Sequence, residues 1–164
     1  MKKIKSFMMM MVAAATVVLG VSSCGSDDDE PEVAVATQVA GSYTGNEVVV
    51  VMGEESSNDT KTYVFTKVLD TAVDLTIPEM GMGGHMSIPS LSVKNIPLKK
   101  NGNTISGNLA SYTGSVTNAD GVEKAFSITN LVVLVDGKNI AVTYSLKYGN
   151  MPMSMETTFT GTKK

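Results

Sequence analysis

Residues 140–159 read IAVTYSLKYGNMPMSMETTF, and apolar side chains alternate with polar ones in both halves of this stretch. Every second side chain of residues 140–148 is aliphatic or aromatic, and every second side chain of residues 151–159 is Met, Thr or Phe. A period of two is typical of β-strands that bury one face. Gly149-Asn150 lies between the halves and is typical of a tight turn. The stretch therefore predicts a β-hairpin and favours an all-β fold.

The same alternation predicts which face of the hairpin is buried. With a two-residue turn at Gly149-Asn150, the predicted pairs are Tyr148–Met151, Leu146–Met153, Tyr144–Met155, Val142–Thr157 and Ile140–Phe159. All of these lie on one face, and polar residues such as Lys147 and Glu156 lie on the other. A slip of one residue would bury the polar set, so the choice of face is strongly specified. We interpret the Met/Tyr face as the interior of a barrel.

The rest of the chain beyond Gly41 continues the β pattern, with turn residues between short alternating segments. The predicted strands are 42–52, 60–69, 72–78, 86–99, 103–109, 111–117, 123–135, 139–148 and 151–161. Antiparallel links this short indicate a meander, and closing a meander into a barrel removes its exposed edges. We expect a single antiparallel up-and-down barrel of about eight strands.

For the strand at residues 123–135, the pattern does not decide which of its two faces points into the barrel. Phe126, Ile128, Val132 and Leu134 alternate one way, whereas Leu131, Val133 and Val135 alternate the other. A two-residue turn at Asp136-Gly137 places the second set inside, and a bulged three-residue turn places the first set inside. Either choice leaves some large apolar side chains on the outer surface.

The predicted interior is the first candidate site. Its lining residues are Tyr144, Leu146, Tyr148, Met151, Met153, Met155 and Phe159. An eight-stranded barrel is just wide enough to fill itself with side chains or to hold one small molecule. The leading hypothesis is a small, mainly apolar ligand. The alternative is a solid core in a module that binds or inhibits another protein. The sequence does not separate the two, because both need the same apolar face.

A second candidate is a soft-metal or haem site in the segment Glu79–Met86. Met80, Met82, His85 and Met86 supply thioethers and one imidazole, which suit Cu(I). Methionine is also a common filler of irregular apolar space, so a structural role competes with metal binding. The expectation is no cofactor, with metal binding as an alternative only.

The N-terminal segment is a targeting sequence to be set apart from the fold. Three lysines precede an apolar run from Phe7 to Val21, which is shorter than the roughly 20 residues of a spanning helix. Val21-Ser22-Ser23-Cys24 resembles the lipobox of a bacterial lipoprotein, and Asp27–Glu30 resembles the acidic export tag of Bacteroidota surface lipoproteins. This resemblance implies lipid on Cys24 and an outer-membrane, cell-surface location. The expected divisions are a cleaved signal peptide at 1–23, a lipidated acidic tether at 24–38 and a barrel domain at 39–164.

Charge and motifs narrow the function classes. The chain has 13 basic residues, all of them lysines, and 16 acids. Without arginine it lacks the side chain that reads guanine and phosphate with two hydrogen bonds, so we expect no nucleic-acid partner. There is one histidine and no nucleophile-elbow motif, so we expect no enzyme activity. The protein partner, if there is one, is not specified.

Several short motifs together resemble the calycin-like, or lipocalin-like, β-barrel lipoproteins of Bacteroidales. The chain opens with Ala40-Gly41-Ser42-Tyr43-Thr44-Gly45, similar to that family's G-x-Y-x-G start, and the segments 101–107, 144–153 and 158–163 fit its middle and closing hairpin. The resemblance implies a barrel of about eight strands. The resemblance implies no defined activity and identifies no ligand-binding residues in this chain.

Thr71 is a possible modification site. Asp70-Thr71-Ala72 resembles the O-glycosylation acceptor of exported Bacteroidota proteins, and it falls at a predicted turn. A plain Asp-Thr turn accounts for the same three residues without a sugar.

Overall fold

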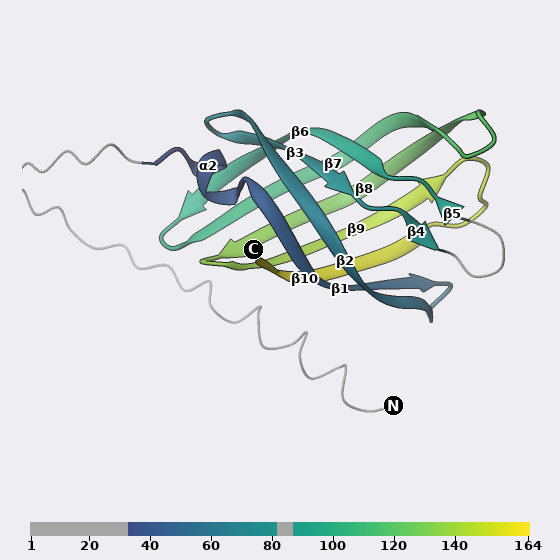
Figure 1. Ribbon diagram of the computed structural model, residues 1–164, viewed down its shortest axis with the longest axis horizontal. Coiled ribbons are helices and arrows are strands. Elements are labelled where there is room, and N and C mark those ends of the chain that lie inside the picture. Colours follow the sequence, from purple (N-terminus) through teal and green to yellow (C-terminus); the bar gives the residue numbers. More distant parts are fainter. Residues whose placement is uncertain (1–32, 82–86) are drawn as a thin grey trace, which may run out of the picture. The chain divides into compact units, whose positions relative to one another are not determined.

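The computed structural model describes residues 33–81 and 87–164, and its strands close into one antiparallel barrel (Figure 1). The strand order around the barrel is β1-β10-β9-β8-β7-β6-β3-β2. The bounds are β1 Gly41–Val51, β2 Glu54–Leu69, β3 Ala72–Ile77, β6 Leu91–Asn101, β7 Thr104–Thr117, β8 Glu123–Asp136, β9 Asn139–Tyr148 and β10 Met155–Lys163. The predicted all-β class and the closed barrel of eight strands are therefore confirmed.

Three smaller elements complete the structure. A short helix α2 (Val35–Val39) precedes β1, and β4 (Met80–Gly81) pairs with β5 (Ser87–Ile88) in a separate two-stranded sheet. The predicted strand 86–99 is wrong in its bounds, because β5 and β6 are separate strands. The predicted strands 103–109 and 111–117 form the single strand β7. Across the described ranges, no helix is long and apolar enough to cross a membrane.

The barrel has two distinct ends (Figure 1). We call one the α2 end, because α2 packs there: the Ala36 N–H donates to the Asp70 carbonyl, and the Tyr43 hydroxyl donates to the Val39 carbonyl at 2.9 Å. Ala36 and Val39 are fully buried, so the helix closes this end. The opposite, far end carries the Met52-Gly53 turn, the β4–β5 sheet, and the loops 118–122 and 149–154.

A β-bulge in β8 determines which of its side chains point into the barrel. Asn130 in β8 has φ 54°, and the β8–β9 register shifts between Thr129 and Val132. The bulge adds one residue, which changes the residues that point inward. Phe126 and Ile128 are buried before the bulge, and Leu131, Val133 and Val135 are buried after it. Each predicted face is therefore correct for one part of the strand, and Leu134 is left exposed.

The closing hairpin has its predicted faces and a different register. Leu146 pairs with Met155, Tyr144 with Thr157, and Val142 with Phe159, so each pairing is displaced by two residues from the prediction. A turn forms at Gly149-Asn150, where the Met151 N–H donates to the Tyr148 carbonyl at 3.2 Å, but strand pairing does not start there. The predicted two-residue link between the strands is therefore wrong, and they are joined by the longer loop 149–154. Pro152 gives the physical reason: it has no N–H to donate to a strand ladder. A shift of two residues keeps every side chain on its predicted face.

Candidate functional site

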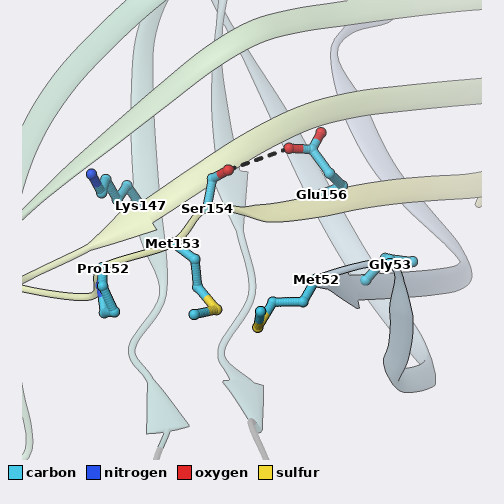
Figure 2. A pocket seen from close by; sticks show the side chains of 8 residues that line it. Met52, Gly53, Lys147, Pro152, Met153, Ser154 and Glu156 are labelled. Atoms are coloured by element: carbon cyan, nitrogen blue, oxygen red, sulfur yellow. Dashed lines mark hydrogen bonds between the residues drawn. The ribbon is translucent and has the colours of Figure 1, made fainter.

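A depression of about 480 Å³ lies on the outer surface at the far end (Figure 2). It is formed where the β1–β2 turn lies beside the β9–β10 loop. The residues that line it are Val50, Met52, Gly53, Lys147, Pro152, Met153, Ser154 and Glu156. Its volume falls in the range of small-molecule sites, although it is open to solvent on one side.

The depression combines an apolar part with a polar edge. Figure 2 shows Met52 and Met153 extending toward each other from the two loops, with Pro152 beside Met153. The Glu156 carboxylate accepts hydrogen bonds from the Ser145 hydroxyl at 2.7 Å and from the Ser154 hydroxyl at 3.5 Å. The carboxylate is thereby fixed at the edge of the apolar surface.

Met52 is held in an unfavourable position for a methionine. Its φ is 54°, Gly53 has φ 85°, and the two residues form the turn between Val51 and Glu54. A left-handed conformation costs a residue with a Cβ about 1 kcal/mol or more. Packing of the Met52 side chain offsets little of this free-energy cost, because the side chain is 80% exposed. Such a residue combines backbone strain with an apolar side chain left in water.

Four of the predicted lining residues lie deep inside the barrel. Leu146, Met155 and Phe159 are 0% exposed, and Tyr144 is 2% exposed. A side chain that borders a void large enough for water keeps some accessible surface, even when the void is sealed. The described barrel is therefore packed solid around Leu146, Met155 and Phe159, and almost no surface is left at Tyr144.

The other three predicted lining residues lie at the far end. Tyr148 is buried at the rim, and its hydroxyl has no hydrogen-bond partner among the described residues. Met151 is half-buried and packs against the core. Met153 is half-buried and lines the depression on the outside. The structure therefore divides the predicted set between the core and the rim.

The interior contains a polar cluster that the pattern of alternation did not single out. The Tyr63 hydroxyl lies 2.5 Å from Oε2 of Glu47 and 2.8 Å from the Tyr144 hydroxyl. Glu47 is 1% exposed, and the Tyr63 ring stacks on Phe159 with centroids 4.0 Å apart. A buried carboxyl needs hydrogen-bond partners, and Tyr63 supplies one.

Burial dominates the titration of this cluster. Desolvation raises the pKa of Glu47 above its ordinary value, against the opposing effects of the Tyr63 hydrogen bond and the Lys61 charge. Desolvation also raises the pKa of Tyr63 and of Tyr144, so both phenols stay protonated and remain donors. The alternation within 42–52 carries the signal for Glu47, because Tyr43, Glu47 and Val49 share a parity and all are buried.

The remaining predicted site residues are placed as follows. Met80 is buried in β4, opposite Ile88, while Met82, His85, Met86 and Cys24 lie outside the described residues. Within residues 33–81 and 87–164, no group of three or more His, Cys, Asp or Glu side chains is arranged to hold a metal ion. Thr71 is exposed at the β2–β3 turn.

The family model for the calycin-like beta-barrel domain matches residues 39–162. The chain belongs to the calycin-like β-barrel family. The resemblance predicted from the short motifs is therefore confirmed. Calycin-like barrels are generally a binding fold rather than an enzyme fold. No curated protein matches the chain.

A solved structure from Bacteroides fragilis, of a protein described as a "putative outer membrane protein", resembles this calycin-like barrel. The TM-score is 0.62 at 19% identity, and the match covers 80% of this chain and 53% of that one. The calycin-like chain thus spans about half the length of that protein. At this identity the likeness shows a shared fold.

Proposed function

We propose that this calycin-like barrel is a lipid-anchored, non-enzymatic surface protein that binds a partner protein at its far end. The observation that carries the proposal is the contrast between the two candidate sites. The predicted interior is filled at Tyr144, Leu146, Met155 and Phe159, whereas Met52 on the outer rim is 80% exposed.

The shape of the depression favours a protein over a free small molecule. Small-molecule pockets bury most of their ligand's surface, and this depression is open on one side. An open hollow with an apolar part and a polar edge fits a side chain that protrudes from a partner, with polar contacts around it. Met52 and Met153 would contact that side chain, since flexible thioethers adapt to irregular shapes.

Charge indicates the chemistry of the partner. The exposed acids of the far half of the barrel are Glu54, Glu55, Asp59, Glu79, Asp120, Glu123 and Glu156, its lysines are Lys61, Lys124 and Lys147, and the ion pair Lys94–Asp74 lies between the two halves. This excess of acids suits a basic partner surface, because complementary charge speeds association and excludes wrong partners.

The anchor supports a location at the outer membrane with the barrel on the cell surface. This location is inferred from the lipobox-like sequence at Cys24, and it agrees with the description of the Bacteroides fragilis protein. Lipid on Cys24 would be detected as added mass on the mature chain. Cys24→Ser should move the protein from the membrane fraction to the soluble fraction, and retention of the variant in the membrane would contradict the anchor.

Photo-crosslinking from the rim of the barrel tests the partner. A benzophenone amino acid replaces Met52 in one variant and Leu134 in a control variant, because Leu134 is an exposed apolar residue far from the depression. On intact cells we expect a discrete crosslinked protein from position 52 and none from position 134. Equal crosslinking from both positions would contradict a site at the far end.

Binding of the purified partner provides the decisive readout. Met52→Asn and Glu54→Lys should each weaken its affinity. Asp136→Lys makes the same change of charge at the α2 end and is the matched control. The proposal fails if the far-end variants bind the partner as tightly as the control does.

A second candidate function is supported by Tyr148. Its buried hydroxyl has no partner within the described part of the chain, and a small, mainly apolar ligand with one polar group would satisfy it. Titration with a fluorescent fatty acid tests this candidate. Saturable binding that Tyr148→Phe abolishes would support it, and the absence of saturable binding would exclude it for this probe.

A further inference from the structure

The lysines of the domain gather at the α2 end. Its side chains include six lysines and two aspartates, which are Lys67, Lys99, Lys100, Lys138, Lys163, Lys164, Asp70 and Asp136. Two of these lysines are hydrogen-bonded to the segment of α2: the Lys67 ammonium donates to the Thr37 hydroxyl, and the Lys163 ammonium donates to the Gln38 carbonyl. The far half has the opposite excess, so charge is separated along the barrel axis.

Exposed apolar side chains share the α2 end with the lysines. Val33 is 54% exposed, Leu69 is 60% exposed and Val68 is 44% exposed. Leu69 and Val68 lie at the end of β2, beside the turn that accepts a hydrogen bond from Ala36. A surface that combines lysines with exposed apolar groups suits the boundary between lipid headgroups and acyl chains.

The chain that leads to Cys24 enters the domain at this same end. Eight residues lie between Cys24 and Val33, so the nine steps of chain from Cys24 to Val33 reach at most about 30 Å. If Cys24 carries lipid, the α2 end cannot move farther than this from the membrane surface. The six lysines are therefore held within reach of the membrane surface, as are the tether acids Asp27–Glu30 and Glu32.

We propose that the α2 end is a docking surface for the phosphate groups of anionic lipids in the membrane that holds the anchor. The proposal rests on the proposed lipid on Cys24 for its physiological setting. Docking would orient the barrel, with the basic end on the headgroups and the acidic far end repelled toward solvent. The depression at Met52 and Met153 would then face outward, available to a partner.

Some of the lysines are better placed for lipid than others. Lys67 forms an ion pair with Asp70 at 2.7 Å, and the Lys163 ammonium donates a hydrogen bond to the Gln38 carbonyl. Lys99 and Lys138 are exposed and form no ion pair within the described ranges. A lysine close to an anionic membrane contributes about fivefold to affinity.

Vesicle binding of the non-acylated protein tests the proposal. The mature chain, from residue 24 with Cys24→Ser, is sedimented with vesicles of phosphatidylglycerol and phosphatidylcholine or of phosphatidylcholine alone. We expect binding only to the anionic vesicles, and weaker binding at higher salt. The variant Lys99→Gln/Lys138→Gln should bind about 25-fold more weakly.

The control removes the same charge from the other half of the barrel. Lys61→Gln/Lys124→Gln should bind anionic vesicles like the wild-type chain, with circular dichroism confirming that each variant is folded. Equal loss in both double variants, or no binding to anionic vesicles at low salt, would overturn the proposal. Because the chain in this test carries no lipid and no partner is present, that result would leave the anchor and the far-end partner site untouched.

Discussion

The Tyr63 hydroxyl donates a hydrogen bond to the Glu47 carboxyl at 2.5 Å, inside a barrel whose surrounding side chains are almost all apolar. Glu47 lies on β1 and Tyr63 on β2, two strands that are hydrogen-bonded neighbours. Ionising a buried acid costs free energy. The hydrogen bond that the Tyr63 hydroxyl donates to the Glu47 carboxyl offsets part of that cost. The pair therefore links the stability of the core to pH.

Glu47→Gln should remove part of the pH dependence of stability. Burial raises the pKa of Glu47 in the folded chain above 4.5, so the folded state binds more protons than the unfolded state above that pH. The contribution of Glu47 is fully present below pH 4.5 and is lost as pH rises through the raised pKa. We expect the wild-type free energy of unfolding to fall across this window relative to that of Glu47→Gln, by about 1.4 kcal/mol per pH unit.

Urea unfolding at a series of pH values measures this difference. Glu54→Gln makes the same chemical change at an exposed position and serves as the control. A wild-type curve parallel to that of Glu47→Gln across the window would contradict a Glu47 pKa raised by burial.

Tyr63→Phe should destabilise the fold more than Tyr144→Phe. The Tyr63 hydroxyl contacts both Glu47 and Tyr144, and its removal leaves a buried carboxyl without its donor, at a cost of about 2 kcal/mol or more. The Tyr144 hydroxyl is hydrogen-bonded to the Tyr63 hydroxyl and not to the carboxyl, so its loss should cost about 1 kcal/mol. Equal effects in urea unfolding would show that the hydroxyl of Tyr63 is not the centre of the cluster.

Met52→Asn should stabilise the protein by about 1 kcal/mol. Asparagine tolerates a positive φ better than methionine, and Asn-Gly is the preferred pair for a two-residue hairpin turn. The same substitution removes an exposed apolar side chain from the depression, so stability and partner binding should change in opposite directions. A loss of stability in thermal unfolding would show that Met52 packs usefully where it stands.

Gly45→Ala should destabilise the barrel by several kcal/mol. A Cβ at Gly45 would overlap the Thr160 carbonyl oxygen and the Gly161 backbone, at the pairing of β1 with β10. Backbone atoms cannot move aside as a side chain can, so the two strands would have to separate. Gly81→Ala is the control, because no atom of the described residues lies within 4 Å of a Cβ there. Comparable stabilities of the two variants would contradict so close an approach of β1 and β10.

The faces of the strands could be predicted from the sequence because side-chain direction has a period of two. Leu146 and Met155 are correctly predicted to point inward even though their predicted partners are wrong. The register depends on the turn, and Gly149-Asn150 is a strong turn signal. A turn does form there, but Pro152 has no N–H for a strand ladder, and the pairing of β9 with β10 starts only at Leu146 and Met155.

Two further features could not be predicted from alternation alone. The bulge at Asn130 changes the parity of β8, and nothing in the pattern decides where an extra residue falls. The second is the burial of Glu47: its parity with Tyr43 and Val49 favours the interior, but alternation does not decide whether an acid will be buried there. An acid within a strand is ordinarily expected on the outer face, because burying it is costly. That expectation would place Glu47 on the wrong face.

The central claim is that the barrel is solid inside and binds on its outer rim. Native mass spectrometry of the mature chain, purified from the membranes of its own host, tests this claim most directly. We predict the mass of the polypeptide with its covalent lipid and no further small molecule. A bound apolar molecule in equal stoichiometry, lost in a Leu146→Trp variant that overfills the interior, would contradict the account.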